Sequence, residues 1–325
     1  MTQGRPILAY ILLCYVITWT VWFSLPLLVG RDWTLLKVTV GIGMGPGLAA
    51  ILLDRVRNGS RRIDGRWWAH FFLVALPVFA IEVLCLATGD ARGAAEFRAT
   101  VAPGITPVGL AGAAAAAAVC GFIFASAARS RDRILSSVAR WRAPLRWWAV
   151  ALLLPAALLG FGYLAERMLG PVPGDPLMGG LPATTWSWLT ARAVFFTFLV
   201  VGIGEEVGWR GWMLPELQKR FSPLSSSLLL GVVWGLWHFP LFVIGAYPGG
   251  PWAVVEYLVM GPLLAILFTW LFNRTGGNLL LSMAFHAAIN DSPRLIPGSA
   301  VFPVLLLAFI VAAIVRDRMW VRRAA

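Results

Sequence analysis

The segment GEEVGWRGW places two adjacent carboxylates and an arginine, Glu205, Glu206 and Arg210, inside an apolar stretch of the chain. On an α-helix, Glu206 and Arg210 are four residues apart and share a face, so we expect them to form an ion pair. Glu205 is five residues from Arg210 and points to another side of the helix. The spacing therefore predicts that Glu206 is structural and that Glu205 is available as a base. A solvated salt bridge at a helix end is the alternative.

Two histidines follow in later apolar stretches, each with a partner four positions away on the same helix face. Trp234 precedes His238, and Pro240 removes a backbone hydrogen bond, so we expect a kink beside this histidine. His286 precedes Asn290, and this pair could hold a water, bind a metal or donate to an oxyanion. It could equally link two helices through hydrogen bonds.

Ionisable residues at membrane depth are costly, which makes them candidates for function. Activation of a water molecule needs a base, a partner that positions it and donors for the developing oxyanion. A carboxylate, two histidines and an amide supply these groups. We therefore expect four side chains to converge in one cavity that is open to water: Glu205, His238, His286 and Asn290.

Transmembrane helices must position these residues, because 59% of the 325 residues are hydrophobic. Runs of about 20 apolar residues, the length that crosses a bilayer, recur along the whole chain. The predicted fold is an all-α, polytopic transmembrane bundle of about ten helices. Glycine pairs spaced four apart in the sixth and seventh spans predict close helix packing there, at Gly204 and Gly208 and at Gly231 and Gly235. The expected spans are residues 7–29, 35–53, 67–87, 105–127, 147–165, 186–212, 224–244, 253–272, 277–291 and 299–315.

The net charge of +12 comes from short basic clusters between apolar runs. That distribution is typical of cytoplasmic loops that face anionic lipid, and it argues against nucleic-acid binding. With the N-terminus inside, 20 of the 27 lysines and arginines fall on the cytoplasmic side. We therefore expect a multi-pass protein of the cell membrane, with both termini in the cytoplasm.

The three motifs, EExxxR, then an aromatic residue four positions before a histidine, then HxxxN, resemble those of the CPBP family of intramembrane proteases. This group, also called the ABI family, contains CAAX proteases and bacteriocin-processing proteins. The resemblance covers roughly residues 186–292, which form the expected catalytic core. Residues 1–165 contain N-terminal transmembrane helices without a motif, and residues 299–325 contain the last helix and a basic tail.

The resemblance implies an endopeptidase in which Glu205 and His238 activate a water, while His286 and Asn290 form the oxyanion hole. Glu206 and Arg210 would support them. The family most often has Phe where this chain has Trp234, and we expect the change to alter pocket shape more than chemistry.

A metal is an alternative, because the family has also been described as metal-dependent and two histidines with a glutamate suit zinc. The sequence contains no HExxH, and the ligands Glu205, His238 and His286 would have to converge from three helices. We therefore favour a glutamate mechanism without a cofactor, with zinc as the alternative.

The implied partners are the lipid bilayer and a membrane-associated peptide or protein substrate. A prenylated CAAX substrate is expected in a eukaryote, whereas short loops rich in Ala, Arg and Trp are typical of a bacterial protein, where bacteriocin-related processing is more natural. A non-catalytic immunity or scaffold protein of the same fold remains an alternative. A small-solute transporter that uses Glu205 and the histidines as a proton relay is another, although the inverted repeats of many transporters are not apparent.

Overall fold

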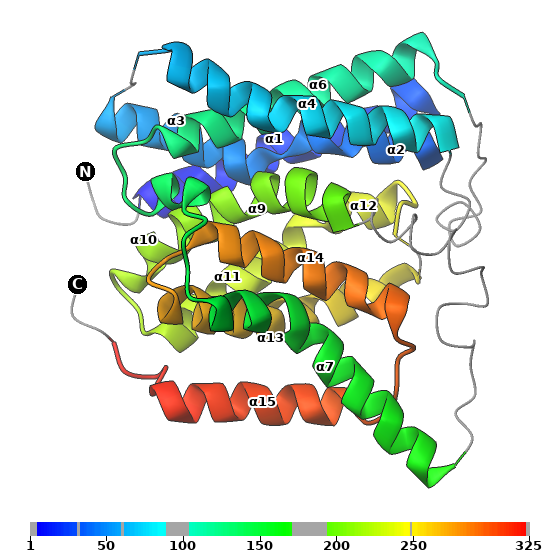
Figure 1. The fold of residues 1–325 in the computed structure, drawn as a ribbon, viewed down its shortest axis with the longest axis vertical. Coiled ribbons are helices and arrows are strands. Elements are labelled where there is room, and N and C mark those ends of the chain that lie inside the picture. The colour runs from blue at the N-terminus through cyan, green and yellow to red at the C-terminus, as the bar shows by residue number, and fades with distance from the viewer. Residues whose placement is uncertain are drawn as a thin grey trace.

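The computed structural model describes residues 5–30, 33–59, 62–88, 104–170, 194–247 and 249–322, and within these ranges it contains helices and no strand. The helices lie side by side in a bundle, as Figure 1 shows, which confirms the predicted all-α class. The larger elements are α1 (Arg5–Val29), α2 (Trp33–Val40), α3 (Gly45–Asn58), α4 (Gly65–Thr88), α6 (Pro107–Ala128), α7 (Leu145–Leu169), α9 (Ile203–Gly208), α10 (Leu214–Gln218), α11 (Pro223–Trp237), α12 (Phe239–Val243), α13 (Gly250–Arg274), α14 (Leu279–Leu295) and α15 (Phe302–Asp317).

Six stretches of the described chain are long and apolar enough to cross a membrane: α1, α4, α6, α7, α11 with α12, and α13. They correspond to six of the ten expected spans. The chain is therefore a multi-pass membrane protein. The other four expected spans are shorter or interrupted helices, and residues 186–193 of the sixth lie outside the described residues.

The prediction of one continuous helix over residues 35–53 is wrong, because the helix is interrupted there. A 3-10 turn, η1 (Gly41–Gly43), separates α2 from α3. Pro46 lacks a backbone N–H and the glycines around it favour non-helical backbone, so a break is the natural outcome of GIGMGPG. The kink predicted at Pro240 is confirmed, since α11 ends at Trp237 and α12 begins at Phe239.

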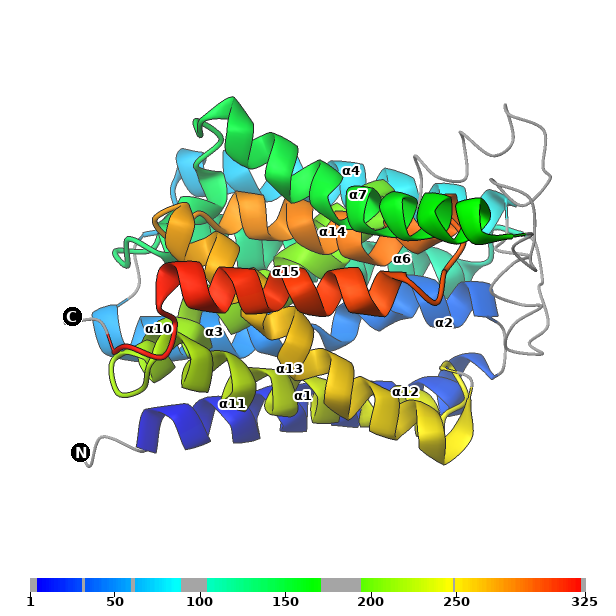
Figure 2. The same ribbon diagram turned by 90° about the horizontal axis from the view of Figure 1, so that it is seen from below.

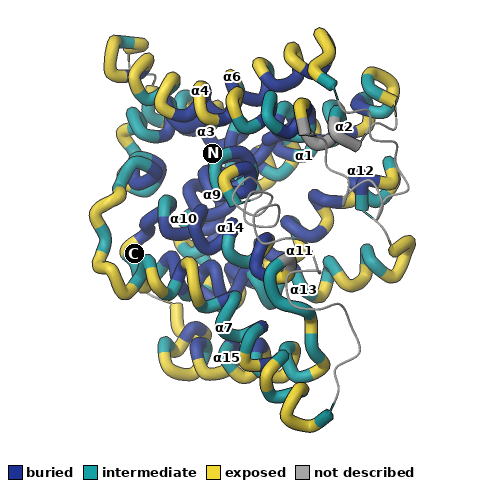
Figure 3. Tube along the Cα trace, turned by 45° about the vertical axis from the view of Figure 1, so that its right-hand side comes forward, coloured by how far each residue is buried: buried dark blue, intermediate teal, exposed yellow. Residues whose placement is uncertain are grey.

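The sixth expected span carries both glutamates on α9, which two π-helical segments flank. These are η4 (Thr197–Gly202) and η5 (Trp209–Met213). Single π turns inside α-helices often mark functional sites. Here they bracket the GEEVG sequence, and every residue of α9 is buried. Figure 3 shows buried chain along α9 and α14 in the middle of the bundle, with exposed residues on the outer helices such as α4 and α15.

The glycine faces predicted for the sixth and seventh spans do permit close approach. A Cβ atom at Gly208 would overlap the backbone of Pro46 on α3, and one at Gly231 would overlap Pro262 on α13. Helices α9 and α11 therefore pack closely against α3 and α13. One of those neighbours, α3, belongs to the N-terminal half.

Ion pairs at one end of the bundle join the helix ends and loops where most of the basic residues lie. Arg57 pairs with Glu216 at 2.6 Å, and Arg129 pairs with Asp64 at 2.7 Å. Arg274 pairs with Asp317 at the start of the C-terminal tail. In Figures 1 and 2 the start of α1 and the end of α15 lie at this same end. The even number of crossings and the cytoplasmic termini expected from the charge distribution stay predictions.

Glu216 is a carboxylate at this end that two cations contact. Its Oε1 accepts hydrogen bonds from Arg57 and from Lys219. Burial raises the pKa of Glu216, but the hydrogen bonds from the two cations outweigh it. The pKa of Glu216 therefore lies below its ordinary value of 4.5.

Candidate functional site

Glu206 is the centre of a buried ionic cluster. Its Oε1 accepts a hydrogen bond from Arg210 Nη1 at 2.8 Å and another from His286 Nδ1 at 2.7 Å. The side chains of Glu206, Arg210 and His286 are at most 2% exposed. The ion pair predicted from the four-residue spacing is confirmed. The second hydrogen bond joins α9 to α14 and fixes the orientation of the His286 ring.

Two indole groups hold the carboxylate of Glu205. Its Oε2 accepts a hydrogen bond from Trp234 Nε1 at 2.6 Å and a longer one from Trp209 Nε1 at 3.3 Å. Glu205 is 4% exposed, and its Oε1 makes no hydrogen bond with the described residues. One oxygen of this carboxylate is thus fixed in place, and the other is free to accept a proton.

Trp234 contacts the ionic cluster as well as Glu205. The Arg210 guanidinium lies 4.9 Å from the centroid of the Trp234 ring and 3.7 Å from that of Phe268, so two aromatic faces share its charge. The ring of His286 meets Trp234 edge to face, with centroids 5.8 Å apart. The expectation that Trp234 alters shape more than chemistry is wrong, because a phenyl ring could not donate to Glu205.

His238 lies at the break between α11 and α12, where it is 7% exposed. Its Nδ1 is 2.8 Å from the carbonyl oxygen of Trp234. A carbonyl oxygen can only accept, so Nδ1 carries the hydrogen and the neutral ring presents a lone pair at Nε2. The rings of Trp237 and Tyr257 flank the imidazole, with centroids at 4.9 and 5.3 Å.

The structure gathers five of the six predicted residues around Trp234 and leaves the sixth apart. His238 and His286 both have ring centroids 5.8 Å from the Trp234 ring, although His238 follows the end of α11 and His286 lies on α14. Asn290 is one helical turn beyond His286, is exposed, and makes no hydrogen bond with the other candidates.

Sequence reasoning missed two aromatic residues of the site. Trp209 is four residues after Glu205, so the spacing that revealed Arg210 could also have revealed this contact. Phe268 on α13 carries no comparable signal, because it belongs to an evenly apolar run. Its place over Arg210 depends on how α13 packs against α11.

Within the described residues, no three side chains of His, Cys, Asp or Glu lie close enough together to hold a metal ion. The donor set proposed for zinc, namely Glu205, His238 and His286, therefore does not form a metal centre in this arrangement.

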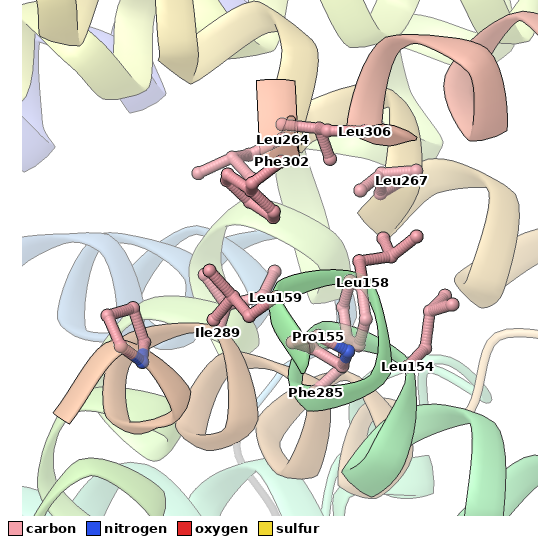
Figure 4. A pocket seen from close by; sticks show the side chains of 11 residues that line it. Leu154, Pro155, Leu158, Leu159, Leu264, Leu267, Phe285, Ile289, Phe302 and Leu306 are labelled. Carbon is pink, nitrogen blue, oxygen red and sulfur yellow. The ribbon is translucent and has the colours of Figure 1, made fainter. Parts of the chain in front are cut away.

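An apolar pocket lies against a different face of α14 and between α7, α13 and α15 (Figure 4). Phe285 and Ile289 of α14 line it, together with Pro155 of α7, Leu264 of α13 and Phe302 of α15. Only apolar side chains surround it, so this pocket offers no group for the chemistry. The ionic cluster is on the neighbouring face of α14.

Comparison with known proteins agrees with the three motifs. Residues 182–291 match the family described as Type II CAAX prenyl endopeptidase Rce1-like. CAAX prenyl protease 2 of Methanococcus maripaludis is 29% identical to this chain over 175 residues. That similarity covers 51% of this chain and 63% of the relative, so less than two thirds of the relative's length is spanned. The family resemblance predicted from the motifs is confirmed.

Proposed function

We propose that this chain, whose segment 182–291 resembles CAAX prenyl endopeptidases of the Rce1-like family, is an intramembrane endopeptidase. It would hydrolyse a membrane-associated peptide or protein with a water that Glu205 activates. The observation that carries the proposal is the state of Glu205, a buried carboxylate with one oxygen fixed by two indoles and the other free. A buried, oriented carboxylate of this kind is suited to general-base catalysis.

In the proposed reaction, Glu205 Oε1 takes a proton from water, and the water oxygen attacks the carbonyl carbon of the peptide. His238 accepts a hydrogen bond from the same water at Nε2, because its Nδ1 donates to Trp234. The C–N bond then breaks, and the proton held by Glu205 passes to the leaving amine.

The oxyanion formed in this reaction requires donors. His286 would donate from Nε2, which requires a hydrogen on both ring nitrogens, and the Nδ1 hydrogen bond to Glu206 is then an ion pair. Asn290 would supply the second donor from its exposed amide. Glu206 and Arg210 would act through His286 as positioning residues.

The substrate follows from the location and from the relative's name. We propose the cell membrane as the location, with the two termini in the cytoplasm and the site reached from that side. The relative is named a CAAX prenyl protease, so a peptide with a C-terminal Cys-aliphatic-aliphatic-X sequence and a prenyl group on the cysteine is the first probe. The same peptide without the prenyl group and a single-span hydrophobic peptide complete the panel.

The test is cleavage of this panel, in fluorescence-quenched form, by the purified protein in liposomes. The wild type should cut at least one peptide, and Glu205→Gln should slow that cleavage at least a hundredfold. Glu256→Gln is the matched control, because Glu256 is exposed on α13 and should keep the wild-type rate. Failure of the wild type on all three peptides, or full activity of Glu205→Gln, would contradict the proposal and favour the non-catalytic scaffold.

A further inference from the structure

Helix α1 lies outside the segment that matches the protease family, yet its side chains bind the backbone of α11. The hydroxyl of Tyr15 donates to the carbonyl oxygen of Val233 at 2.6 Å. The indole of Trp19 donates to the carbonyl oxygen of Trp237 at 3.2 Å. The two residues of each hydrogen bond are 218 positions apart in the sequence. The N-terminal half of the chain therefore binds the helix that carries the second motif.

The carbonyl that Trp19 binds belongs to the end of α11, where backbone partners are scarce. Pro240 has no N–H to donate, and the N–H of Leu241 donates to the carbonyl of His238 at 2.9 Å. Carbonyls in the last turn of a helix need a partner from elsewhere. Trp19 provides that partner for Trp237, the residue directly before His238.

Thr18 makes a second link to the same turn. Its hydroxyl donates to the carbonyl oxygen of Gly43 at 2.8 Å and accepts from Trp237 Nε1 at 2.8 Å and from the N–H of Gly45 at 3.2 Å. One donated and two accepted hydrogen bonds use the full capacity of a hydroxyl group. Thr18 is completely buried, so it ties α1, the break between α2 and α3, and Trp237 into one fixed unit.

The direction of the His238 ring depends on this turn. Its Nδ1 is bound to the carbonyl of Trp234 within α11, so the ring moves with the last turn of that helix. The ring of Trp237 packs against it edge to face, at 4.9 Å between centroids. A small rotation of Trp237 would therefore redirect the free Nε2.

We propose that Thr18 and Trp19 are positioning residues for His238, so that α1 helps to orient a side chain of the site. The inference rests on the proposed function for its kinetic consequence, but the orientation of the His238 ring can be measured without any substrate. In the intact protein, Thr18 and Trp19 hold the end of α11 so that Nε2 of His238 faces the water that Glu205 activates.

The test uses variants that remove one hydrogen-bonding group each. Thr18→Val removes the hydroxyl and keeps the shape, Thr18→Ser restores it, and Trp19→Phe removes only the indole N–H and part of the ring. Thr39→Val is the matched control for threonine, because its buried hydroxyl donates within α2. Trp68→Phe is the matched control for tryptophan, because Trp68 is 47% exposed on α4.

The first readout is ¹⁵N NMR of the full chain labelled with ¹⁵N-histidine. The chain contains three histidines, so few ring signals have to be assigned. Thr18→Val and Trp19→Phe should shift the His238 ring signals and leave those of His70 and His286 in place. The second readout is kinetic: kcat should fall about tenfold with KM within twofold, and Thr18→Ser should recover most of it. Both control variants should match the wild type in both readouts.

Unchanged His238 signals in both Thr18→Val and Trp19→Phe would overturn the inference, whatever happens to the rate. If the wild type cleaves no peptide, the proposed function fails, and the NMR readout still decides whether α1 positions His238. If Thr18→Val does not fold, Trp19→Phe gives the answer.

Discussion

Replacing Glu206 by glutamine tests the division of roles between the two adjacent carboxylates. Glu206 compensates Arg210, whose guanidinium is buried, and also binds His286. Removing one partner of a buried ion pair typically costs about 3–5 kcal/mol, because the other charge is left uncompensated. We expect Glu206→Gln to lower the free energy of unfolding by about 3 kcal/mol.

The same change at Glu205 should have a small effect on stability. Its carboxylate has no cation within hydrogen-bonding distance, and a carboxamide oxygen can still accept from the two indoles. We expect Glu205→Gln to stay within about 1 kcal/mol of the wild type, since a typical neutral hydrogen bond contributes about that much. Its loss should instead appear in the cleavage rate.

The assay is reversible unfolding in mixed micelles with increasing sodium dodecyl sulfate, followed by tryptophan fluorescence. A double variant, Glu206→Gln with Arg210→Gln, should be more stable than the sum of the two single changes predicts, because no charge is left alone. Equal stability of Glu206→Gln and the wild type, or an equal loss in both glutamate variants, would show that the two carboxylates do not have separate roles.

Three further predictions concern the second motif, the charged end and the topology. Trp234→Phe should cost about 2 kcal/mol in unfolding, as expected for a hydrogen bond to a charged group, and less than half of that when Glu205→Gln is already present. Arg57→Gln should cost about 0.5 kcal/mol at pH 7, because its side chain is 40% exposed. Since the pKa of Glu216 is lowered by folding, this cost should vanish as pH falls below 4.5, which unfolding curves from pH 7 to 3 can show; a cost that is the same at pH 3 would contradict it. Reporter fusions after Arg140 and at the C-terminus should both report the cytoplasm, and a C-terminus outside would mean that the number of crossings is odd.

Local spacing predicted the parts of the site that lie on one helix. The ion pair of Glu206 with Arg210 needs only a helical period, and the break near His238 needs only Pro240. Six of the ten expected spans followed in the same way from apolar runs. Between α2 and α3 the apolar run contains glycines and a proline, and the length of the run wrongly predicted one continuous helix. Hydropathy does not report a lost backbone hydrogen bond.

Contacts between distant helices were beyond reach of the sequence alone. The hydrogen bond from His286 to Glu206 and the one from Trp234 to Glu205 depend on how three helices are rotated about their axes. The exposure of Asn290 depends on the same rotation. The role of α1 had no signal at all, because Thr18 and Trp19 resemble ordinary residues of a transmembrane helix until their partners on α11 are known.

The most direct measurement of the central claim is single-turnover cleavage by protein that has been treated with a zinc chelator and dialysed. We expect the wild type to keep its rate, because Glu205 and His238 activate the water without a metal. Glu205→Gln should be slower by roughly 10²–10⁴-fold, the range for loss of a general base. Loss of wild-type activity that returns with added zinc would show that a metal is needed, and an unchanged rate in Glu205→Gln would show that Glu205 is not the base.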